Sequence, residues 1–490
     1  MRRPVLERDA HEQPDRRPRF ARRNVAGRTE RTELDVVPAL AQGLDRCRDM
    51  TPRTAFLEWL DRELQPVHAS QARPTRPAAY DGAMTLSTLA DEARDLQAET
   101  VALRRALHER PEQGNDLPIT REKVLEAIEG LPVDVTLHQT TSGIAAMLTG
   151  GKPGPTVLLR GDMDALPLHE DTGVEFTSKH DGVMHACGHD THTAMLVGAA
   201  KLLSAHQDDI PGRVLFMFQP GEEGHHGAKF MLDEGLLDVP ALADGTPSPV
   251  TGAFALHITS TLPTGRVATR VGPCMASADR FTIRVHGAGG HASEPFRTVD
   301  PIPIACEIVQ ALQTMITRRI DVFDPAVVTV GRIEAGTTNN IIPHYADIEG
   351  TIRTVSESTR ASVHDNLRRV AEKIAEAHGA TAEPDVILGY PVTSNAEAFT
   401  DFTLDVARTV IGDDKVYRLP NPIMGAEDFS YVLNQVPGTM MFLGGTGEDR
   451  NPRTAPANHS NLVVFDESAM PTGVELYAQM ALRHLGVQPD

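Results

Sequence analysis

Apolar residues follow a helical period at the start of the regular part of this chain and a strand–helix alternation after it. From Met84 to Arg110 the spacing is that of an amphipathic helix, which Pro111 and Gly114 end. Continuous apolar runs then alternate with helical segments. The runs cover residues 143–150, 156–168, 213–220 and 252–258. This alternation predicts an α/β domain with a mostly parallel sheet and helices on both of its faces.

Near residue 276 the pattern changes to that of a smaller α+β unit. Its predicted elements are a strand over 279–287, a helix over 300–319, strands over 327–336 and 346–355, a helix over 357–379 and a strand over 384–392. The order βαββαβ is typical of a ferredoxin-like domain. After about residue 392 the α/β pattern resumes. We therefore expect residues 84–275 and 393–490 to form one domain, with 276–392 inserted in it.

Residues 1–83 differ from the rest in composition. They are rich in arginine and proline, contain no lysine, and hold only short, separated apolar patches. Such a segment buries too little apolar surface to offset the entropy of ordering, so we expect it to be disordered. It is either a regulatory tail, a dispensable extension, or upstream sequence translated from a start codon placed too early, since Met84 opens a helix.

Charge and cysteine content exclude several classes of protein. The 490 residues carry a net charge of −20, which argues against a nucleic-acid partner or an anionic membrane. No apolar run approaches the roughly 18–20 residues that span a bilayer. The four cysteines are too sparse for a disulfide scaffold, and the start of the chain lacks the apolar segment of a secretory signal. We expect a cytoplasmic protein.

The densest group of chemically active residues is His185-Ala-Cys187-Gly-His189-Asp190-Thr-His192, just before an apolar helix. Cys187 and His189 are two residues apart, so both can point at one ion from a tight turn. Thiolate and imidazole suit Zn, Co, Ni or Mn ions. The segment therefore predicts a metal site.

Three successive apolar strands end in further donor residues. Asp162 and Asp164 close one strand, Glu222 and Glu223 follow the next, and His257 ends the third. Sites in α/β proteins lie at the carboxyl ends of strands. Adjacent glutamates leaving a strand can diverge, so that one binds a metal while the other faces a water.

Other polar residues lie in the inserted unit and near the end of the chain. His291 follows a glycine-rich stretch, and Asn340 and Arg353 interrupt otherwise apolar strands. A phosphate loop is not supported, because no Lys-Ser/Thr pair follows these glycines. Glu427-Asp428 and His459 form two more polar sets between glycine and apolar residues.

Taken together, these segments resemble the metallo-aminoacylase/carboxypeptidase superfamily, in particular its N-acyl-amino-acid amidohydrolases of the hippurate hydrolase and indole-acetyl-amino-acid hydrolase kind. The resemblance covers residues 84–490. The motifs that carry it are RRALHERPE, RGDMDALPLHEDTG, MHACGHDTHTAML, FQPGEEGHHGA, ALHI, GAGGHASEP, NNIIPHYADIEGTIRT, MGAEDFSYV and NHS.

The resemblance implies a site with two divalent metal ions. Cys187 matches the ligand that bridges them. His189 and His257 match the other ligands of one ion, and Glu223 and His459 those of the second. The identity of the metal (Zn, Mn, Co or Ni) stays open.

It also implies roles for residues that do not bind metal. Glu222 matches the general base and acid, and Asp164 the carboxylate that orients a ligand imidazole. His291 resembles a histidine of a lid domain that reaches the partner subunit's active site to stabilise the oxyanion. Asn340 and Arg353 match substrate-binding positions of that lid. A homodimer formed through the lid is therefore expected.

The function expected from the resemblance is metal-dependent hydrolysis of N-acyl amino acids. The alternatives are a dipeptidase or aminoacylase of the same superfamily, or a non-catalytic metal-binding homologue. The sequence departs from the family pattern in residues 1–83, in the loose segment that follows ERPE, and at Gly221, where alanine is usual.

Overall fold

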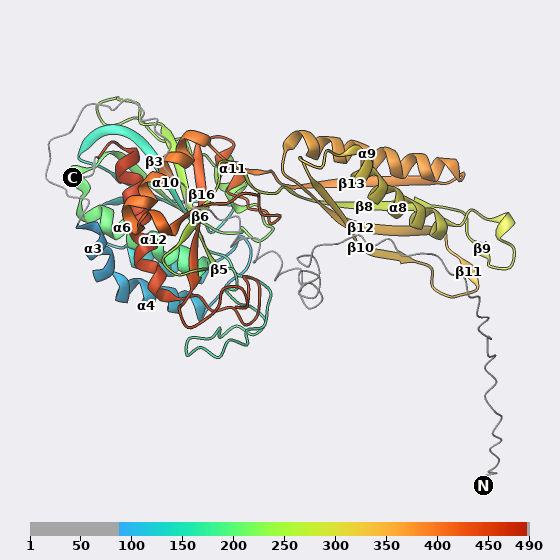
Figure 1. The fold of residues 1–490 in the computed structure, drawn as a ribbon, viewed down its shortest axis with the longest axis horizontal. Coiled ribbons are helices and arrows are strands. Elements are labelled where there is room, and N and C mark those ends of the chain that lie inside the picture. The colour runs from blue at the N-terminus through green and yellow to red at the C-terminus, as the bar shows by residue number, and fades with distance from the viewer. Residues whose placement is uncertain (1–87, 488–490) are drawn as a thin grey trace, which may run out of the picture. The chain divides into compact units, whose positions relative to one another are not determined.

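The computed structural model of the protein describes residues 88–487 (Figure 1). The predictions for residues 1–83 and for a helix start at Met84 lie outside the described residues. In the part of the chain that is described, strands form an eight-stranded sheet, a four-stranded sheet and two small two-stranded pairings.

The eight-stranded sheet has the order β1-β2-β4-β3-β5-β16-β6-β15. Its strands are β1 (Val133–Leu137), β2 (Ile144–Thr149), β3 (Lys152–Asp162), β4 (Pro211–Gln219), β5 (Val250–Pro263), β6 (Val267–Thr269), β15 (Val416–Arg418) and β16 (Gly438–Thr446). β3 is parallel to β4 and β5, and β5 is parallel to β16. The prediction of a mainly parallel sheet is confirmed for this centre.

The edge of the sheet that carries β1 and β2 departs from the parallel arrangement. β2 pairs antiparallel with both β1 and β4. β2 ends at Thr149 and β3 begins at Lys152. A parallel crossover needs about a dozen residues or more, so the short connection from β2 to β3 reverses the direction of the chain.

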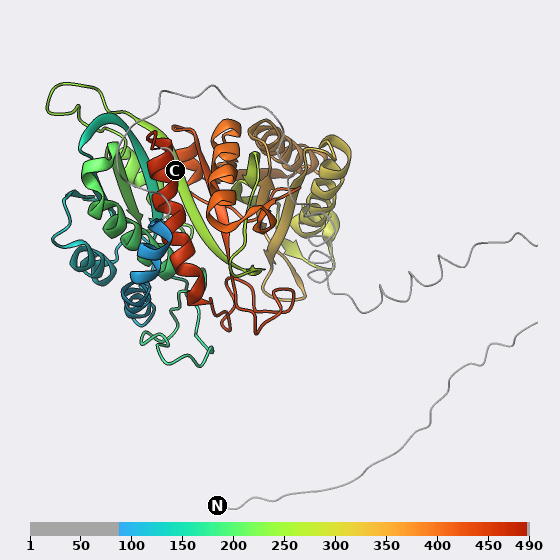
Figure 2. The ribbon, with the colours of Figure 1, turned by 60° about the vertical axis from the view of Figure 1, so that its left-hand side comes forward.

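Helices cover both faces of the large sheet, as predicted. Successive side chains of β3 belong to hydrophobic cores on opposite faces of the sheet: Val157 and Leu159 belong to the first core, and Leu158 belongs to the second. α6 and α12 pack against each other over the first core (Figure 2). The helices of the first core are α3 (Leu89–Asp95), α4 (Gln97–His108), α5 (Pro118–Ile128), α6 (His189–Ala205), α10 (Glu397–Ile411) and α12 (Met470–His484); α7 (Gly227–Asp233) and α11 (Ser430–Leu433) flank the second.

The helix predicted from Met84 to Arg110 is divided in the structure. α3 ends at Asp95 and α4 begins at Gln97, with Leu96 between them. The hydroxyl of Thr100 donates to the backbone oxygen of Leu96 at 2.9 Å and shares that acceptor with its own amide. Such back-bonding can bend a helix, but the same bond from Thr403 to Phe399 leaves α10 unbroken, so the structure gives no single cause for the break.

Along the chain, the segment between the two parts that form the large sheet forms a second, four-stranded sheet. Its order is β10-β12-β8-β13, all antiparallel, with α8 and α9 beside it (Figure 1). Along the chain the elements are β8 (Ala278–His286), α8 (Pro301–Arg319), β10 (Ala326–Ala335), β12 (Tyr345–Thr354), α9 (Glu357–Ala377) and β13 (Thr381–Tyr390). It has a hydrophobic core of its own.

Two short pairings flank the four-stranded sheet. β7 (Gly272–Met275) pairs with β14 (Thr393–Asn395), so the chain segments that enter and leave the second sheet lie side by side. β9 (Gly290–His291) pairs with β11 (Ile341–Ile342). The first pairing places the end of β13 close to the large sheet.

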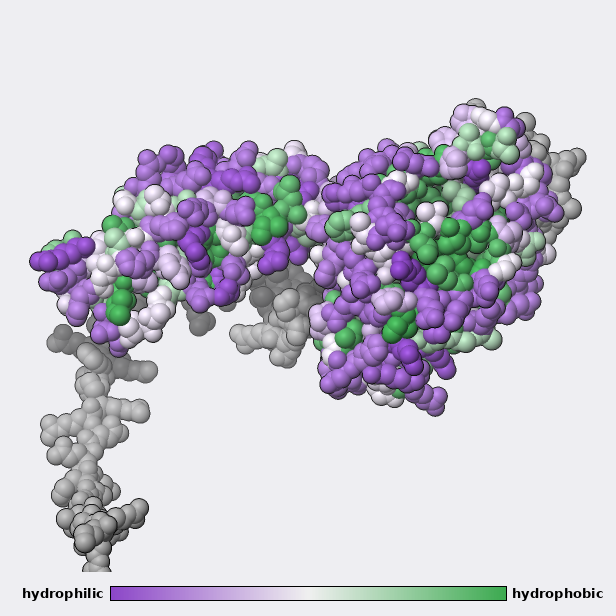
Figure 3. Space-filling view, turned by 180° about the vertical axis from the view of Figure 1, so that it is seen from behind, coloured by the Kyte–Doolittle hydropathy of each residue, from purple (hydrophilic) through white to green (hydrophobic). Residues whose placement is uncertain are grey.

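The surface face shown in Figure 3 is mostly hydrophilic, and its apolar side chains gather in separate patches. This agrees with a chain in which 23% of the residues are charged. Among residues 88–487, every helix is too short or too polar to cross a bilayer.

Candidate metal centre

The metal-ligand candidates meet where the central strands of the large sheet end. Asp162 is the last residue of β3 and Gln219 the last of β4, and His257 lies in the second half of β5. Because β4, β3 and β5 are parallel neighbours, their carboxyl ends share one edge of the sheet. Glu222 and Glu223 follow β4 directly and come to the same edge.

A glycine turn delivers the second part of the cluster at the start of α6. Gly188 has φ of 92°, in the left-handed region that favours glycine. A Cβ at this position would lie 2.4 Å from Cγ2 of Ile258. The turn therefore needs glycine, and it directs the side chains of Cys187 and His189 to the same place.

Two sets of donor atoms share Cys187. In each set the donor atoms lie within 4.8 Å of one another: Cys187, His189 and His257 form the first, and Cys187, Glu223 and His459 the second. Sγ of Cys187 is 3.4 Å from Nε2 of His257 and 3.2 Å from Nε2 of His459. The structure thus brings together all five predicted ligands, in the two groups expected.

The chemistry of these atoms fits divalent cations. Nε2 of His189 lies 3.3 Å from Oδ2 of Asp162, and Oε1 of Glu223 lies 3.1 Å from Nε2 of His459. Burial, with Glu223 and Glu222 nearby, raises the pKa of the Cys187 thiol. Imidazole nitrogens, carboxylate oxygens and a thiol whose donor atoms lie within 4.8 Å of one another are typical of a Zn-type site.

Backbone oxygens fix the orientation of two ligand imidazoles. Nδ1 of His189 donates to the backbone oxygen of Asp164 at 2.8 Å. Nδ1 of His257 donates in the same way to Ile258, at 2.7 Å. The Nε2 atom of each ring is thereby left to face the site.

His192, the last imidazole of the dense cluster, is used differently. Its Nδ1 lies 2.6 Å from a carboxylate oxygen of Asp162, and its Nε2 accepts the backbone N–H of Ile258 at 2.7 Å. Both ring nitrogens are occupied, so His192 supports the site rather than offering a free ligand atom.

The carboxylate of Asp164 holds the turn that carries the paired glutamates. Its two oxygens accept the backbone N–H groups of Glu222 and Glu223, each at 3.0 Å. Nδ1 of His189 lies 2.8 Å from the backbone oxygen of Asp164 and 3.3 Å from its Oδ1, so Asp164 faces this imidazole as well as the turn.

Glu222 lies beside the candidate ligands, since donor atoms of His189, Glu222 and Glu223 lie within 4.8 Å of one another. It is buried, and its Oε2 is 3.9 Å from Nε2 of His189. Burial, with Glu427 and Glu223 close by, raises the pKa of Glu222 well above its ordinary value. A carboxyl group with this environment is a candidate for proton transfer.

Sequence reasoning missed a buried ionic group beneath the site. The guanidinium of Arg160 is fully buried and lies 2.8 Å from Asp162, 2.7 Å from Glu427 and 3.4 Å from Asp428. Oxygens of Asp162, Glu222 and Glu427 also lie within 4.8 Å of one another. An arginine inside the apolar run TVLLR was the available signal.

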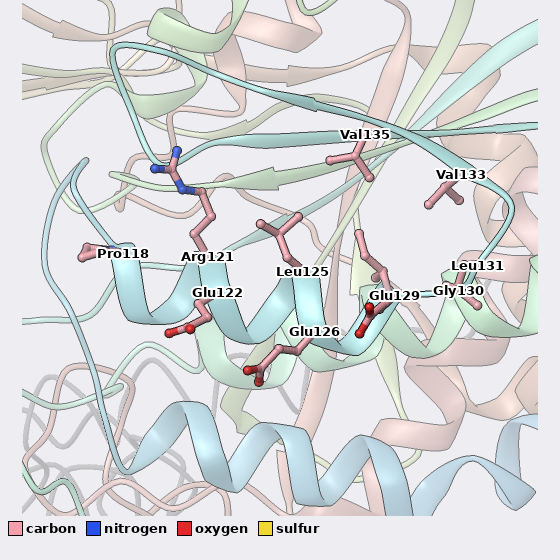
Figure 4. A pocket seen from close by; sticks show the side chains of 11 residues that line it. Pro118, Arg121, Glu122, Leu125, Glu126, Glu129, Gly130, Leu131, Val133 and Val135 are labelled. Carbon is pink, nitrogen blue, oxygen red and sulfur yellow. The ribbon is translucent and has the colours of Figure 1, made fainter.

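A cavity of about 560 Å³ opens at the two donor sets. Arg353 and Tyr390 line it, together with the apolar side chains of Leu262, Met275 and Phe442. A larger groove, of about 640 Å³, lies between α5 and β1 (Figure 4). Its lining residues include neither histidine nor cysteine, so the chemistry belongs to the first cavity.

The other residues predicted for the inserted unit lie away from the donor sets within this chain. His291 is exposed on β9, and its Nδ1 accepts hydrogen bonds from Ser293. Asn340 is exposed just before β11, and its backbone oxygen accepts the amide of Ala292. Neither is among the residues that line the cavity, whereas Arg353 is.

Comparisons with known proteins agree with this geometry. Peptidase family M20/M25/M40 matches residues 158–483. Thermostable carboxypeptidase 1 of Saccharolobus solfataricus is 38% identical over 399 residues, which cover 81% of this chain and 98% of the relative. IAA-amino acid hydrolase ILR1-like 4 of Arabidopsis thaliana is 36% identical over 79% of this chain and 85% of its own.

A solved structure of a related protein is similar as well. The Bacillus subtilis YXEP protein, described as a dinuclear metal binding peptidase from the M20 family, matches with a TM-score of 0.68 and 32% identity. The match covers 81% of this chain and all of that one.

Proposed function

This chain belongs to peptidase family M20/M25/M40 and is a metal-dependent amidohydrolase, and we propose that its substrates are N-acyl amino acids. The reaction would release a carboxylic acid and a free amino acid. The observation that carries the proposal is the pair of donor sets that share Cys187, with Glu222 beside them at the mouth of one cavity.

The five predicted ligands would hold two divalent ions. Cys187, His189 and His257 would bind one ion, and Cys187, Glu223 and His459 the other. When bound, such ions supply the positive charge that acidifies an attacking water, polarises the amide carbonyl and offsets the clustered carboxylates.

Glu222 is the residue that moves the proton. It would take a proton from the attacking water and deliver it to the nitrogen of the leaving amino acid. Its burial excludes bulk water from this exchange. Asp164 positions it by holding the amide groups of Glu222 and Glu223.

The cavity suits a substrate that is apolar at one end and charged at the other. Arg353 would bind the carboxylate of the amino acid at the charged end. His257, Phe442 and Ala268 are neighbours in one row across β5, β16 and β6, and all three line the cavity. Adjacent strands are about 4.8 Å apart, so this row extends about 10 Å from the ligand His257, enough for an aromatic acyl group. We therefore propose a hippurate-like substrate.

The proposed roles of His291 and Asn340 require a dimer. We assign residues 84–275 and 393–490 to the catalytic domain, and 276–392 to a ferredoxin-like lid that also forms a homodimer. His291 would then stabilise the oxyanion in the partner subunit's site, with Asn340 binding substrate there. The exposure of both residues, away from their own cavity, supports such a role.

A reducing compartment suits this chemistry. Among the described residues, Cys187, Cys274 and Cys306 are free thiols, and Cys187 must stay reduced to bind metal. We therefore place the enzyme in the cytoplasm.

The decisive experiment combines metal removal with a substrate panel. The purified protein would be treated with a chelator and assayed before and after addition of Zn, Mn, Co or Ni, on hippurate, N-acetyl amino acids, indole-acetyl amino acids and dipeptides. Activity on N-acyl amino acids that metal restores supports the proposal. Activity on dipeptides alone supports a dipeptidase, and no activity with bound metal supports a non-catalytic homologue.

A further inference from the structure

Tyr390 connects the four-stranded sheet to the turn that carries Glu222. It is the last residue of β13, it is only 6% exposed, and it lines the cavity. Its hydroxyl donates to the backbone oxygen of Glu222 at 2.6 Å. Neither the metal-ligand candidates nor the residues assigned to proton transfer include it.

The contact acts on one peptide group. The peptide that joins Glu222 to Glu223 has its N–H on Oδ2 of Asp164, at 3.0 Å, and its C=O on the hydroxyl of Tyr390. Rotation of this peptide would turn the two glutamate side chains relative to each other. It is therefore held on one side from β3 and on the other from β13.

The turn is closed by two further backbone donors: the amide of Glu222 donates to Oδ1 of Asp164 at 3.0 Å, and the amide of Gly227 donates to the backbone oxygen of Gly221 at 3.1 Å. Gly221 and Gly224, which flank the two glutamates, have φ of 67° and 87°. Glycine permits this backbone but contributes no side chain that could fix it. Within the turn, the amide of Gly224 donates to the same oxygen of Glu222 at 2.8 Å. Contacts from outside the turn must therefore decide the orientation of the peptide.

We propose that Tyr390 is a positioning residue that sets the orientation of Glu222 from the side of the four-stranded sheet. The inference rests on the proposed function, because it matters only where Glu222 transfers the proton. Burial, reinforced by Asp428 and Glu222, raises the pKa of Tyr390, so its hydroxyl stays protonated as a donor at neutral pH.

Tyr390 is itself anchored to elements of both sheets. The amide of the preceding Gly389 donates to Oδ1 of Asp279 on β8, at 2.9 Å, and its carbonyl accepts the hydroxyl of Tyr431 on α11, at 3.2 Å. A displacement of β8 and β13 would thus be transmitted to Glu222. Arg353 lies on β12 of the same sheet. The four-stranded sheet therefore carries both Arg353, which would bind the substrate, and Tyr390, which contacts the peptide of Glu222.

The test compares two hydroxyl deletions of the same size. Tyr390→Phe removes the contacts of the hydroxyl with the backbone oxygen of Glu222 and, at 3.4 Å, with the amide of His226. Tyr431→Phe removes a hydroxyl that contacts the carbonyl of Gly389 and Nδ1 of His226 but not the Glu222 peptide, so it controls for the loss of the His226 and Gly389 contacts. We expect Tyr390→Phe to lower kcat about tenfold with KM changed less than about twofold, and Tyr431→Phe to leave both within about twofold. Metal content and melting temperature of the two variants are measured alongside.

Hydrogen–deuterium exchange gives a readout that does not depend on catalysis. In Tyr390→Phe the amides of residues 221–224 should exchange faster than in the wild type, with or without metal, and in Tyr431→Phe they should not. Equal kinetic losses in both variants, unchanged exchange, or loss of metal in step with activity would each overturn the inference. If the metal-loaded wild type fails to hydrolyse any N-acyl amino acid, the proposed function falls, while the exchange result still decides what Tyr390 holds.

Discussion

Ala268 should determine how large an acyl group the enzyme accepts. It lines the cavity and lies on β6 in the same row as Phe442 and His257, two strands away from His257. The substitution Ala268→Leu adds three carbon atoms where the distal part of an aromatic ring would lie. The methyl of an acetyl group stays near His257 and does not reach this position.

The magnitude follows from the apolar area that the ring loses. A buried aromatic ring removes about 150 Å² from water, worth roughly 4 kcal/mol at about 25 cal/mol per Å². If the added side chain displaces half of the ring, the loss is about 2 kcal/mol, or roughly 30-fold in kcat/KM.

The assay compares kcat/KM for N-benzoylglycine and N-acetylglycine in the wild type and in Ala268→Leu. N-benzoylglycine should lose about 30-fold, and N-acetylglycine less than about threefold, so the second substrate is the internal control. A melting temperature near that of the wild type shows that the buried strand tolerates the change. Equal losses for both substrates, or none for N-benzoylglycine, would refute the assignment of this cavity to the acyl group.

Three further predictions concern the base, the inserted unit and the dimer. Glu222→Gln should keep both metals, measured by elemental analysis, while hydrolysis falls about 100-fold or more; loss of metal in proportion would show that Glu223 is the base instead. In the inserted unit, burial opposes the ionisation of Asp279, but hydrogen bonds from Arg360 and other donors outweigh it and hold the pKa of Asp279 below its usual range. Asp279→Asn should therefore lower the free energy of unfolding by about 3 kcal/mol at pH 7. A depressed pKa stabilises only above the unfolded value, so this difference should shrink in denaturant titrations below about pH 4, and a difference that does not depend on pH would contradict the ionic account. His291→Ala should lose activity and keep metal, and mixing it with Glu222→Gln should restore about a quarter of wild-type activity per subunit; no recovery despite subunit exchange would exclude donation across a dimer.

The hydrophobic pattern predicted the helices and strands well because the burial of apolar side chains is the largest favourable free-energy term in folding. The strand that ends at Asp162 and the helix that begins near His189 follow from apolar runs and their flanks. Since the carboxyl ends of parallel strands share one edge, the amino-acid sequence alone predicts that Asp162, the paired glutamates after β4 and His257 lie together, although β5 continues beyond His257 to Pro263. The direction of a strand at the edge of the sheet could not be predicted in this way. An apolar run such as that of β2 fits a parallel or an antiparallel neighbour equally well.

The residues that sequence reasoning missed act through contacts between distant segments. Arg160 and Glu427 are 267 positions apart, and neither segment indicates that the other holds its partner. Their pairing, like the contact of Tyr390 with Glu222, 168 positions away, becomes visible only when the sheets are assembled. His291, by contrast, was singled out from the sequence, but its predicted role needs a second subunit. Within its own chain it is exposed.

Metal removal should destabilise the fold as well as abolish activity. Asp162, Glu222 and Glu427 crowd together with Arg160 as the cation paired beside them, and burial weakens the screening of their mutual repulsion. Ions that bind the folded form alone stabilise it by about 2.7 kcal/mol at a hundred times Kd. We therefore expect the melting temperature to fall by a few degrees on chelation and to return with added Zn or Mn. Identical melting curves with and without metal would mean that these carboxylates are neutralised by protons instead, and that the donor sets do not hold their ions tightly.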